Sequence, residues 1–307
     1  IKYFDLRINE VSKLSNKLIL KKFFIMQKML KTFWKIILFS SLILINNGKK
    51  TNARTLPVCE PDSGDPSILK DMECIATPEV YKLKVFEMGL CVSDPLEGTT
   101  EKSGGYANTD NKTYLTSCTA TYKSVDGFEV DFMDGTTDLV GQNIRPPENT
   151  YYYSYIKIEN FVGIKGKYTL DGTEYCSKNV ASNTNATTGN PSCTSKYFVQ
   201  DLIDFRAGAT CSNNYESASY KSYDSGVVKA LLTDINDNGA ATCNASTTKR
   251  VLGTFKPSSP IKINSSTNGL EVTFSVIDSG LLVNGNSSDP KIFSFSSGAL
   301  IPAFNVF

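Results

Sequence analysis

Along most of this chain, apolar residues recur at every second position, which is the period of β-strands that bury one face. In segment 128–132 the apolar residues are Phe128, Val130 and Phe132, with acidic residues between them, and segment 270–276 has the same alternation. Both segments are predicted to be half-buried antiparallel strands. The same pattern predicts further strands at 118–122, 151–158, 251–255 and 291–295.

Two segments carry more specific signals. Between residues 81 and 90 the apolar face shifts by one position after Val85, which predicts a β-bulge near that residue. The dipeptide Asp171-Gly172 separates two strand-like runs at 164–170 and 173–176, and it favours a tight hairpin turn. The pattern does not decide whether segments 196–205 and 226–233 are strands or short helices.

The segments between these strands are short and rich in Gly, Ser, Asn and Thr, and no long helical segments alternate with the strands. This organisation is typical of all-β folds. We therefore predict an antiparallel β-sandwich over residues 78–307. Residues 54–77 form a short N-terminal extension with two cysteines, in which 66–72 is expected to make one or two helical turns. Residues 1–53 are expected to lie outside the folded product.

An export signal is predicted at 29–53. Basic residues after Met29 precede the apolar run 36–45, and a polar segment follows that ends at Ala53. These are the three parts of a secretory signal peptide, with cleavage expected after Ala53. The apolar run has 10 residues, whereas a membrane-spanning helix needs about 20. We predict a periplasmic, extracellular or cell-surface protein without a transmembrane segment after cleavage; a retained anchor is the alternative.

The cysteines indicate the same compartment, because all eight follow Ala53. An even number of cysteines in an exported chain predicts disulfides. Zinc is the competing explanation, but the sequence has neither a C-x-x-C pair nor a histidine. Sequential pairing is favoured, above all for 91 with 118 and 176 with 193. The candidates are Cys59, Cys74, Cys91, Cys118, Cys176, Cys193, Cys211 and Cys243.

Charge and composition exclude several functions. Residues 1–53 contain eleven Lys and Arg against two acidic residues, so the remainder carries a net charge of −8. Such a chain without a basic cluster is not expected to bind nucleic acid. The absence of histidine excludes Ser-His and Cys-His nucleophile pairs and His-ligated metal centres. A non-enzymatic role is therefore predicted, with no cofactor unless calcium binds.

A family resemblance follows from five runs of sequence. These are PEVYKLKVFEMGLC (78–91), SCTATY (117–122), GFEVDFMDG (127–135), PPENTYYYSYIKI (146–158) and VGIKG (162–166). Together they resemble exported bacterial domains of unknown function with a prealbumin-like or Ig-like sandwich, although Asn149 stands where their Pro-x-Gly-x-Tyr motif has glycine. The resemblance implies a sandwich fold and a cell-envelope or extracellular location, and it implies no activity.

Three groups of residues are candidates for a site. Tyr151, Tyr153 and Tyr155 share one strand face and could stack on sugar rings, or pack inside the core instead. The run Asp234-Ile-Asn-Asp-Asn-Gly239 resembles the first half of a calcium loop, with Asp234, Asn236 and Asn238 as ligands, although Ala245 occupies the position of the bidentate Glu. An ordinary Asn-Gly turn is the alternative.

The third group consists of Glu129 and Asp131, which share a strand face and would suit a carboxylate-dependent hydrolase. Solvated acids on the outer face of a strand are the simpler explanation. Our leading hypothesis is therefore a structural, display or adhesion protein that binds a protein partner or assembles with itself. A carbohydrate- or calcium-binding module is the alternative, and a carboxylate-dependent hydrolase is a second alternative.

Overall fold

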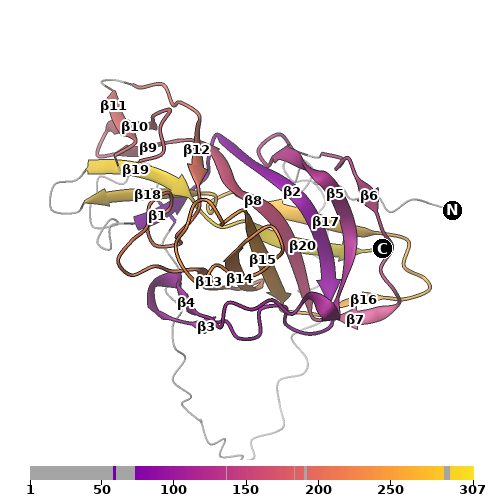
Figure 1. Ribbon diagram of the computed structural model, residues 1–307. Helices are drawn as coiled ribbons and strands as arrows, with labels where there is room; N and C mark the ends of the chain where they lie inside the picture. Colours follow the sequence, from indigo (N-terminus) through magenta and orange to yellow (C-terminus); the bar gives the residue numbers. More distant parts are fainter. Residues whose placement is uncertain (1–57, 60–72, 136, 183, 190–191, 287–290) are drawn as a thin grey trace, which may run out of the picture. The chain divides into compact units, whose positions relative to one another are not determined.

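The structure is a computed structural model, and Figure 1 shows its strands in sequence colours. It describes residues 58–59, 73–135, 137–182, 184–189, 192–286 and 291–307, all of which belong to one unit of the chain. The predicted signal at 29–53 and the predicted helical turns at 66–72 lie outside the described residues. Among the described residues the only helical segments are two 3-10 turns, η2 (Ser103–Gly105) and η3 (Leu115–Ser117).

The largest sheet has eight strands, joined in the order β13, β14, β15, β8, β2, β5 and β6, with β12 also paired to β8. All of these pairs are antiparallel. The strands are β2 (Val80–Cys91), β5 (Cys118–Asp131), β6 (Gln142–Asn143), β8 (Tyr153–Lys165), β12 (Phe198–Asp201), β13 (Ala218–Tyr223), β14 (Gly226–Thr233) and β15 (Arg250–Pro257).

The three long strands at the centre of this sheet confirm the predicted bulge. The register of β2 shifts between Val85 and Glu87 against both β5 and β8. The extra residue moves the side chains that follow to the other face. Alternation in 81–90 therefore changes phase because the strand carries a bulge, as the sequence indicated.

The remaining strands form smaller antiparallel sheets. The strand β18 pairs with β1 and β19, β17 pairs with β20, and β10 pairs with β9 and β11. Two short pairs, β7 with β16 and β3 with β4, complete the structure. The bounds are β1 (Glu73–Ala76), β3 (Thr100–Glu101), β4 (Ala107–Asn108), β7 (Asn149–Tyr151), β9 (Lys167–Leu170), β10 (Thr173–Ser177), β11 (Ala186–Gly189), β16 (Ile261–Ile263), β17 (Leu270–Ser275), β18 (Leu281–Asn286), β19 (Lys291–Ser297) and β20 (Ile301–Val306).

Most strand predictions are confirmed, and the two open segments are settled. Residues 226–233 form β14, and 196–205 contain β12, so both are strands rather than helices. Asp171 and Gly172 connect β9 to β10 with φ angles of 48° and 69°, the left-handed backbone that a two-residue hairpin turn requires. The sandwich is not confirmed, because the strands are divided among several open sheets.

Two hydrophobic clusters cover opposite faces of the large sheet. The first joins residues of β2 and β8, such as Leu83 and Val162, to the C-terminal strands through Val272 and Phe295. The second joins Leu231 and Leu252 to residues of segment 92–117, which covers that face. Other segments therefore pack against parts of both faces of the sheet.

Four disulfides connect the eight cysteines in sequential pairs, as predicted: Cys59–Cys74, Cys91–Cys118, Cys176–Cys193 and Cys211–Cys243. Such bridges persist in oxidising compartments. The structure therefore supports a location outside the cytoplasm. A helix of the length and apolarity needed to cross a membrane is not found among the described residues.

The bridge between Cys91 and Cys118 links directly opposed residues of β2 and β5 at the end of the sheet. We expect replacement of both cysteines by alanine to lower the free energy of unfolding by about 3 kcal/mol, because the unfolded chain gains the freedom of an open loop. Denaturant unfolding of the oxidised protein measures the change. An unchanged unfolding midpoint would mean that this bridge does not stabilise the fold.

Candidate functional site

A large cavity lies between one face of the eight-stranded sheet and the C-terminal strands. Its volume is about 670 Å³. Its lining comes from β2, β8, β13, β14 and β15 on the sheet side, and from β17, β18, β19 and β20 on the other. In Figure 1, β17 and β20 are drawn behind β2 and β8. The first hydrophobic cluster includes residues of both walls, so the two walls of the cavity pack against each other around it.

On the sheet side, the cavity has room because small side chains lie next to one another in a row across neighbouring strands. Ser219, Ala230, Gly253, Ile156 and Met88 lie opposite one another on five neighbouring strands, and all five line the cavity. The first three have small or no side chains, so space remains above β13, β14 and β15. At the other end of the row, the larger apolar side chains of Ile156 on β8 and Met88 on β2 bound the cavity.

The opposite wall is aromatic and aliphatic. Phe274 of β17 packs edge-on against Phe132 with ring centroids 5.6 Å apart. Phe304 of β20 stacks on Phe255 of β15 with centroids 6.1 Å apart. Both aromatic pairs connect residues of β17 and β20 to residues at or near the large sheet, and Phe255, Phe274 and Phe304 line the cavity. Aromatic pairs of this kind add to the stabilisation from burial.

Lys221 is one of the few charged residues that line this mainly apolar space. It lies on β13, opposite Val228 of β14, and it lines the cavity. Its solvent exposure is intermediate, yet desolvation by the surrounding protein lowers the pKa of Lys221, and Glu73 opposes that shift. Within the described part of the chain, Lys221 makes no ion pair and no side-chain hydrogen bond.

A glycine provides the space for this lysine. Gly105 has a φ of +80°, and a Cβ at this position would lie 3.0 Å from Cε of Lys221. The 105 carbonyl accepts a hydrogen bond of 2.9 Å from the Ser219 hydroxyl on β13. The turn 103–105 is therefore fixed against β13 beside the lysine stem.

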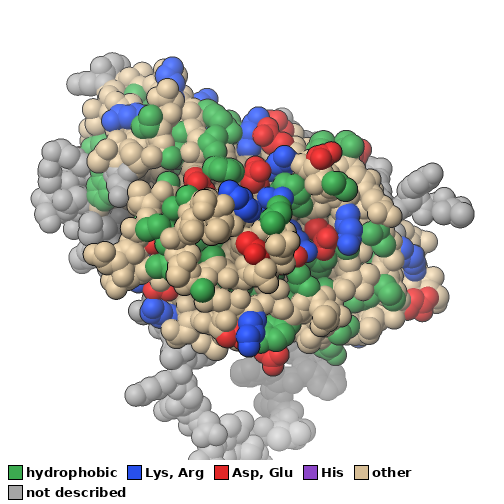
Figure 2. All heavy atoms as spheres, in the orientation of Figure 1, with side chains coloured by type: hydrophobic (Ala, Val, Ile, Leu, Met, Phe, Trp, Pro, Cys, Tyr) green, Lys and Arg blue, Asp and Glu red, His purple; other side chains and the backbone are tan. Residues whose placement is uncertain are grey.

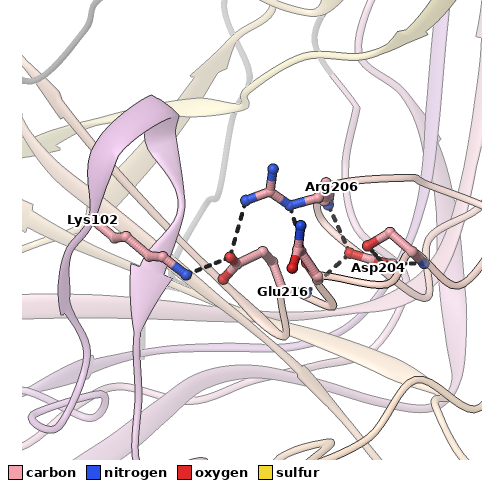
Figure 3. A network of polar contacts seen from close by, with 6 residues as sticks. Lys102, Asp204, Arg206 and Glu216 are labelled. Carbon is pink, nitrogen blue, oxygen red and sulfur yellow. Dashed lines mark hydrogen bonds and ion pairs between the residues drawn. The ribbon is translucent and has the colours of Figure 1, made fainter.

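A charged network forms a polar section of the lining near this turn (Figure 3). Glu216 accepts from the Lys102 ammonium at 2.6 Å and from the Arg206 guanidinium at 3.2 Å. The guanidinium carbon of Arg206 lies 4.5 Å from the centroid of the Tyr106 ring. Arg206 and Tyr106 line the cavity, whereas Lys102 reaches the network from the hairpin of β3 and β4.

Asp204 holds the loop that carries Arg206. Its side chain is fully buried. One carboxylate oxygen accepts from the backbone N–H groups of Arg206 at 2.8 Å and Glu216 at 3.1 Å. The other accepts from the backbone N–H and the hydroxyl of Ser212 at 2.9 and 2.7 Å. A buried carboxylate with this many donors fixes the loop conformation.

Three tyrosines near the cavity stay protonated over a wide pH range. Burial raises the pKa of Tyr81 and of Tyr106, and it raises the pKa of Tyr223 to about 12. The Tyr81 hydroxyl donates to the carbonyl of Gly298 at 3.1 Å. These hydroxyls are therefore neutral hydrogen-bonding groups at neutral pH, and they do not neutralise the charge of Lys221.

The tyrosine row predicted as a stacking surface is not formed. Tyr151 and Tyr155 are only 2% and 5% exposed and belong to different hydrophobic clusters, and Tyr153 is half-buried. The Tyr151 hydroxyl donates to the carbonyl of Pro147 at 2.8 Å, and that of Tyr155 donates to Glu87. Burial by other segments, which strand alternation does not reveal, turns these residues into core.

The proposed calcium ligands lie in one turn, in which the Asp234 carboxylate accepts hydrogen bonds from the two asparagines. The Asp234 carboxylate accepts from the backbone N–H groups of Asn236 and Asn238 at 2.8 and 2.9 Å, and from the Asn238 side chain at 2.9 Å. The bond from the Asn238 side chain contributes most to lowering the pKa of Asp234. These contacts explain the turn without a metal, and calcium binding at Asp234, Asn236 and Asn238 stays a prediction.

The acidic pair on β5 also makes structural contacts. Glu129 forms an ion pair of 3.4 Å with Lys82 on the exposed face of the sheet. Asp131 accepts from the backbone N–H groups of Tyr81 at 3.2 Å and Met133 at 3.0 Å. Both acids therefore have structural partners. The hydrolase hypothesis stays a prediction that these contacts do not support.

One further group could suggest a metal. Ligand atoms of Glu174, Cys176 and Cys193 lie within 4.8 Å of one another. However, the two sulfur atoms are joined in a disulfide. Thiolates are the form that binds metal, so the oxidised chain does not offer this site.

Of the cavity residues, Tyr155 was a sequence candidate, whereas the cations Lys221 and Arg206 were missed by sequence reasoning. The strand β13 has the sequence ASYKSY, in which Ser219 and Lys221 occupy alternate positions. A lysine in such a pattern is ordinarily on the solvent face. The local sequence showed only that this strand mixes polar and aromatic residues. That pattern did not distinguish Lys221 or Arg206 from surface residues.

The visible surface and the comparisons add little to the site. On the face shown in Figure 2, acidic and basic side chains are mixed rather than gathered into an area of one sign. No protein-family model, curated protein or solved structure matches the chain. The cavity is therefore the feature of the described residues that points to a function.

Proposed function

We propose that this protein binds an apolar or amphipathic small molecule in the cavity between the large sheet and the C-terminal strands. The observation that supports the proposal is the cavity itself, with about 670 Å³ and a mainly apolar lining. Ligand sites in proteins have volumes of about 300 to 1,000 Å³, mostly apolar walls and a few placed polar groups. The cavity has all three properties.

The volume argues for a ligand rather than for imperfect packing. Protein interiors are close-packed, and voids larger than a few water molecules are uncommon. At roughly 30 Å³ per molecule, the cavity would hold on the order of 20 waters. Water gains few hydrogen bonds beside residues such as Leu83, Met88 and Val272. An apolar molecule would restore the dispersion contacts that these side chains lack.

The architecture suits this role. We propose that β17, β18, β19 and β20 act as the second layer of a sandwich-like structure that covers the ligand. The hydrophobic contacts of Val272 and Phe295 with the sheet cluster support this arrangement. The four disulfides stabilise a fold whose core is partly hollow. Binding requires no catalytic group, which agrees with the predicted non-enzymatic role.

We expect apolar ligands to stabilise the native protein. A ligand at a concentration of 100 times its dissociation constant adds about 2.7 kcal/mol to the free energy of unfolding. The measurement is thermal unfolding of the oxidised protein with long-chain alcohols, sterols and fatty acids, and with soluble glycans and calcium chloride as controls. A rise of the midpoint with the apolar compounds alone is expected. A rise with glycans or calcium alone would instead favour the carbohydrate- or calcium-binding alternative.

A structural, display or adhesion role stays a separate proposal. It is compatible with export and with self-assembly or a protein partner, but it does not account for the cavity. The absence of any midpoint shift with the apolar compounds, in a cooperatively unfolding sample, would contradict the binding proposal and return this role to first place.

A further inference from the structure

Lys221 is the cation of the described cavity lining that has no ion pair, whereas Arg206 is paired. In the polar section, Lys102 and Arg206 both bind Glu216. The second acid, Asp204, accepts hydrogen bonds from three backbone N–H groups and one hydroxyl. These two cations and two anions form a neutral network that needs no further ion. Lys221, on the neighbouring β13, is not part of it.

Among the described lining residues, Glu73 is the acid that acts on Lys221. Glu73 also lines the cavity, and its charge favours the protonated form of Lys221, but the two form no ion pair. The hydroxyls of Tyr81, Tyr106 and Tyr223 stay neutral, because burial raises their pKa. A desolvated ammonium without a close anion is unfavourable unless a negatively charged group pairs with it. Because Lys221 lines the cavity, a ligand bound in the cavity can supply that group.

We infer that the ligand of this cavity carries a single carboxylate at the end of an apolar body, and that this carboxylate pairs with Lys221. The inference rests on the proposed function and adds the ligand class to it. A single ammonium suits a single negative charge, whereas phosphate groups are more often held by several donors or a bidentate arginine. Arg206, the other cation among the described lining residues, already pairs with Glu216. A long-chain fatty acid has the required chemistry.

The test compares two ligands that differ only in the head group. Palmitate and hexadecanol have the same chain, and each is titrated against the oxidised full-length protein preloaded with the neutral dye Nile red. Displacement of the dye gives both dissociation constants. A charged hydrogen-bonded pair contributes about 1.5 to 3 kcal/mol, which corresponds to roughly tenfold or more in affinity. We therefore expect palmitate to bind at least about tenfold more tightly than hexadecanol.

Four variants test whether this preference depends on Lys221. Lys221→Met keeps the length and apolar volume of the stem, so palmitate should lose about tenfold in affinity while hexadecanol is unchanged. Lys221→Gln, a polar replacement, should give the same loss. Lys256→Met removes an exposed lysine of β15 that does not line the cavity, and it should change neither value. Glu73→Gln should bind palmitate at least as tightly as the wild type, because a competing acid is removed.

The outcomes separate the two proposals. Equal affinities for both ligands in the wild type, unchanged in Lys221→Met, would overturn the carboxylate pairing and leave an apolar cavity that binds neutral molecules. Weaker palmitate binding in Glu73→Gln would also contradict it. Failure of every apolar compound to displace the dye or to raise the unfolding midpoint would overturn the proposed function itself. Unchanged hexadecanol binding in Lys221→Met shows that this variant is folded.

Discussion

Replacing Ala230 with phenylalanine should abolish ligand binding and stabilise the ligand-free protein. Ala230 lies between Ser219 and Gly253 in the row of small residues on the sheet wall, and its side chain lines the cavity. A phenyl ring at this position would project into the space above three strands. Burial of an aromatic side chain contributes about 1.5 to 3 kcal/mol when it fits without strain. The same ring would occupy the volume that the ligand needs.

The expected measurements are a loss of Nile red and palmitate binding by at least about a hundredfold, which corresponds to about 2.8 kcal/mol, and a raised unfolding midpoint without ligand. Ala303→Phe is the matched control, because Ala303 is exposed on β20 and does not line the cavity. This control should bind the dye as the wild type does. Wild-type binding by Ala230→Phe would place the ligand elsewhere on the protein.

The second large effect is expected at Asp204. Replacement by alanine removes the acceptor of four hydrogen bonds and leaves the N–H groups of Arg206, Ser212 and Glu216 without their partner. Breaking a buried charged network of this kind costs roughly 3 to 5 kcal/mol. We expect a loss of that size in the free energy of unfolding, measured by denaturant titration of the oxidised protein.

Loss of Asp204 should also weaken palmitate binding, because the loop it holds carries Arg206 in the cavity lining. The control is Asp126→Ala, an exposed acid on β5, which should change stability by no more than about 0.5 kcal/mol. A loss below about 1 kcal/mol for Asp204→Ala would mean that the loop rearranges and satisfies its donors in another way.

The sequence by itself determined the features of this protein that depend on neighbours along the chain. Period-two alternation located most of the strands, and a one-residue change of phase located the bulge after Val85. The Asp171-Gly172 turn follows from backbone conformations that few residues adopt. The pairing of Cys91 with Cys118 joins two segments that a polar stretch separates, which local reasoning identifies.

Only the tertiary structure decided which strand faces meet and what lies between them. Tyr151 and Tyr155 have the same alternation as an exposed row, but segments distant in sequence bury them in two different clusters. Lys221 has the sequence surroundings of a solvent-facing lysine, but the pairing of β13 with β14 and the cover from the C-terminal strands place it on a cavity wall. Alternation tells which side chains share a face of a strand. Whether that face meets water, a packed layer or a cavity depends on long-range contacts that no local pattern encodes.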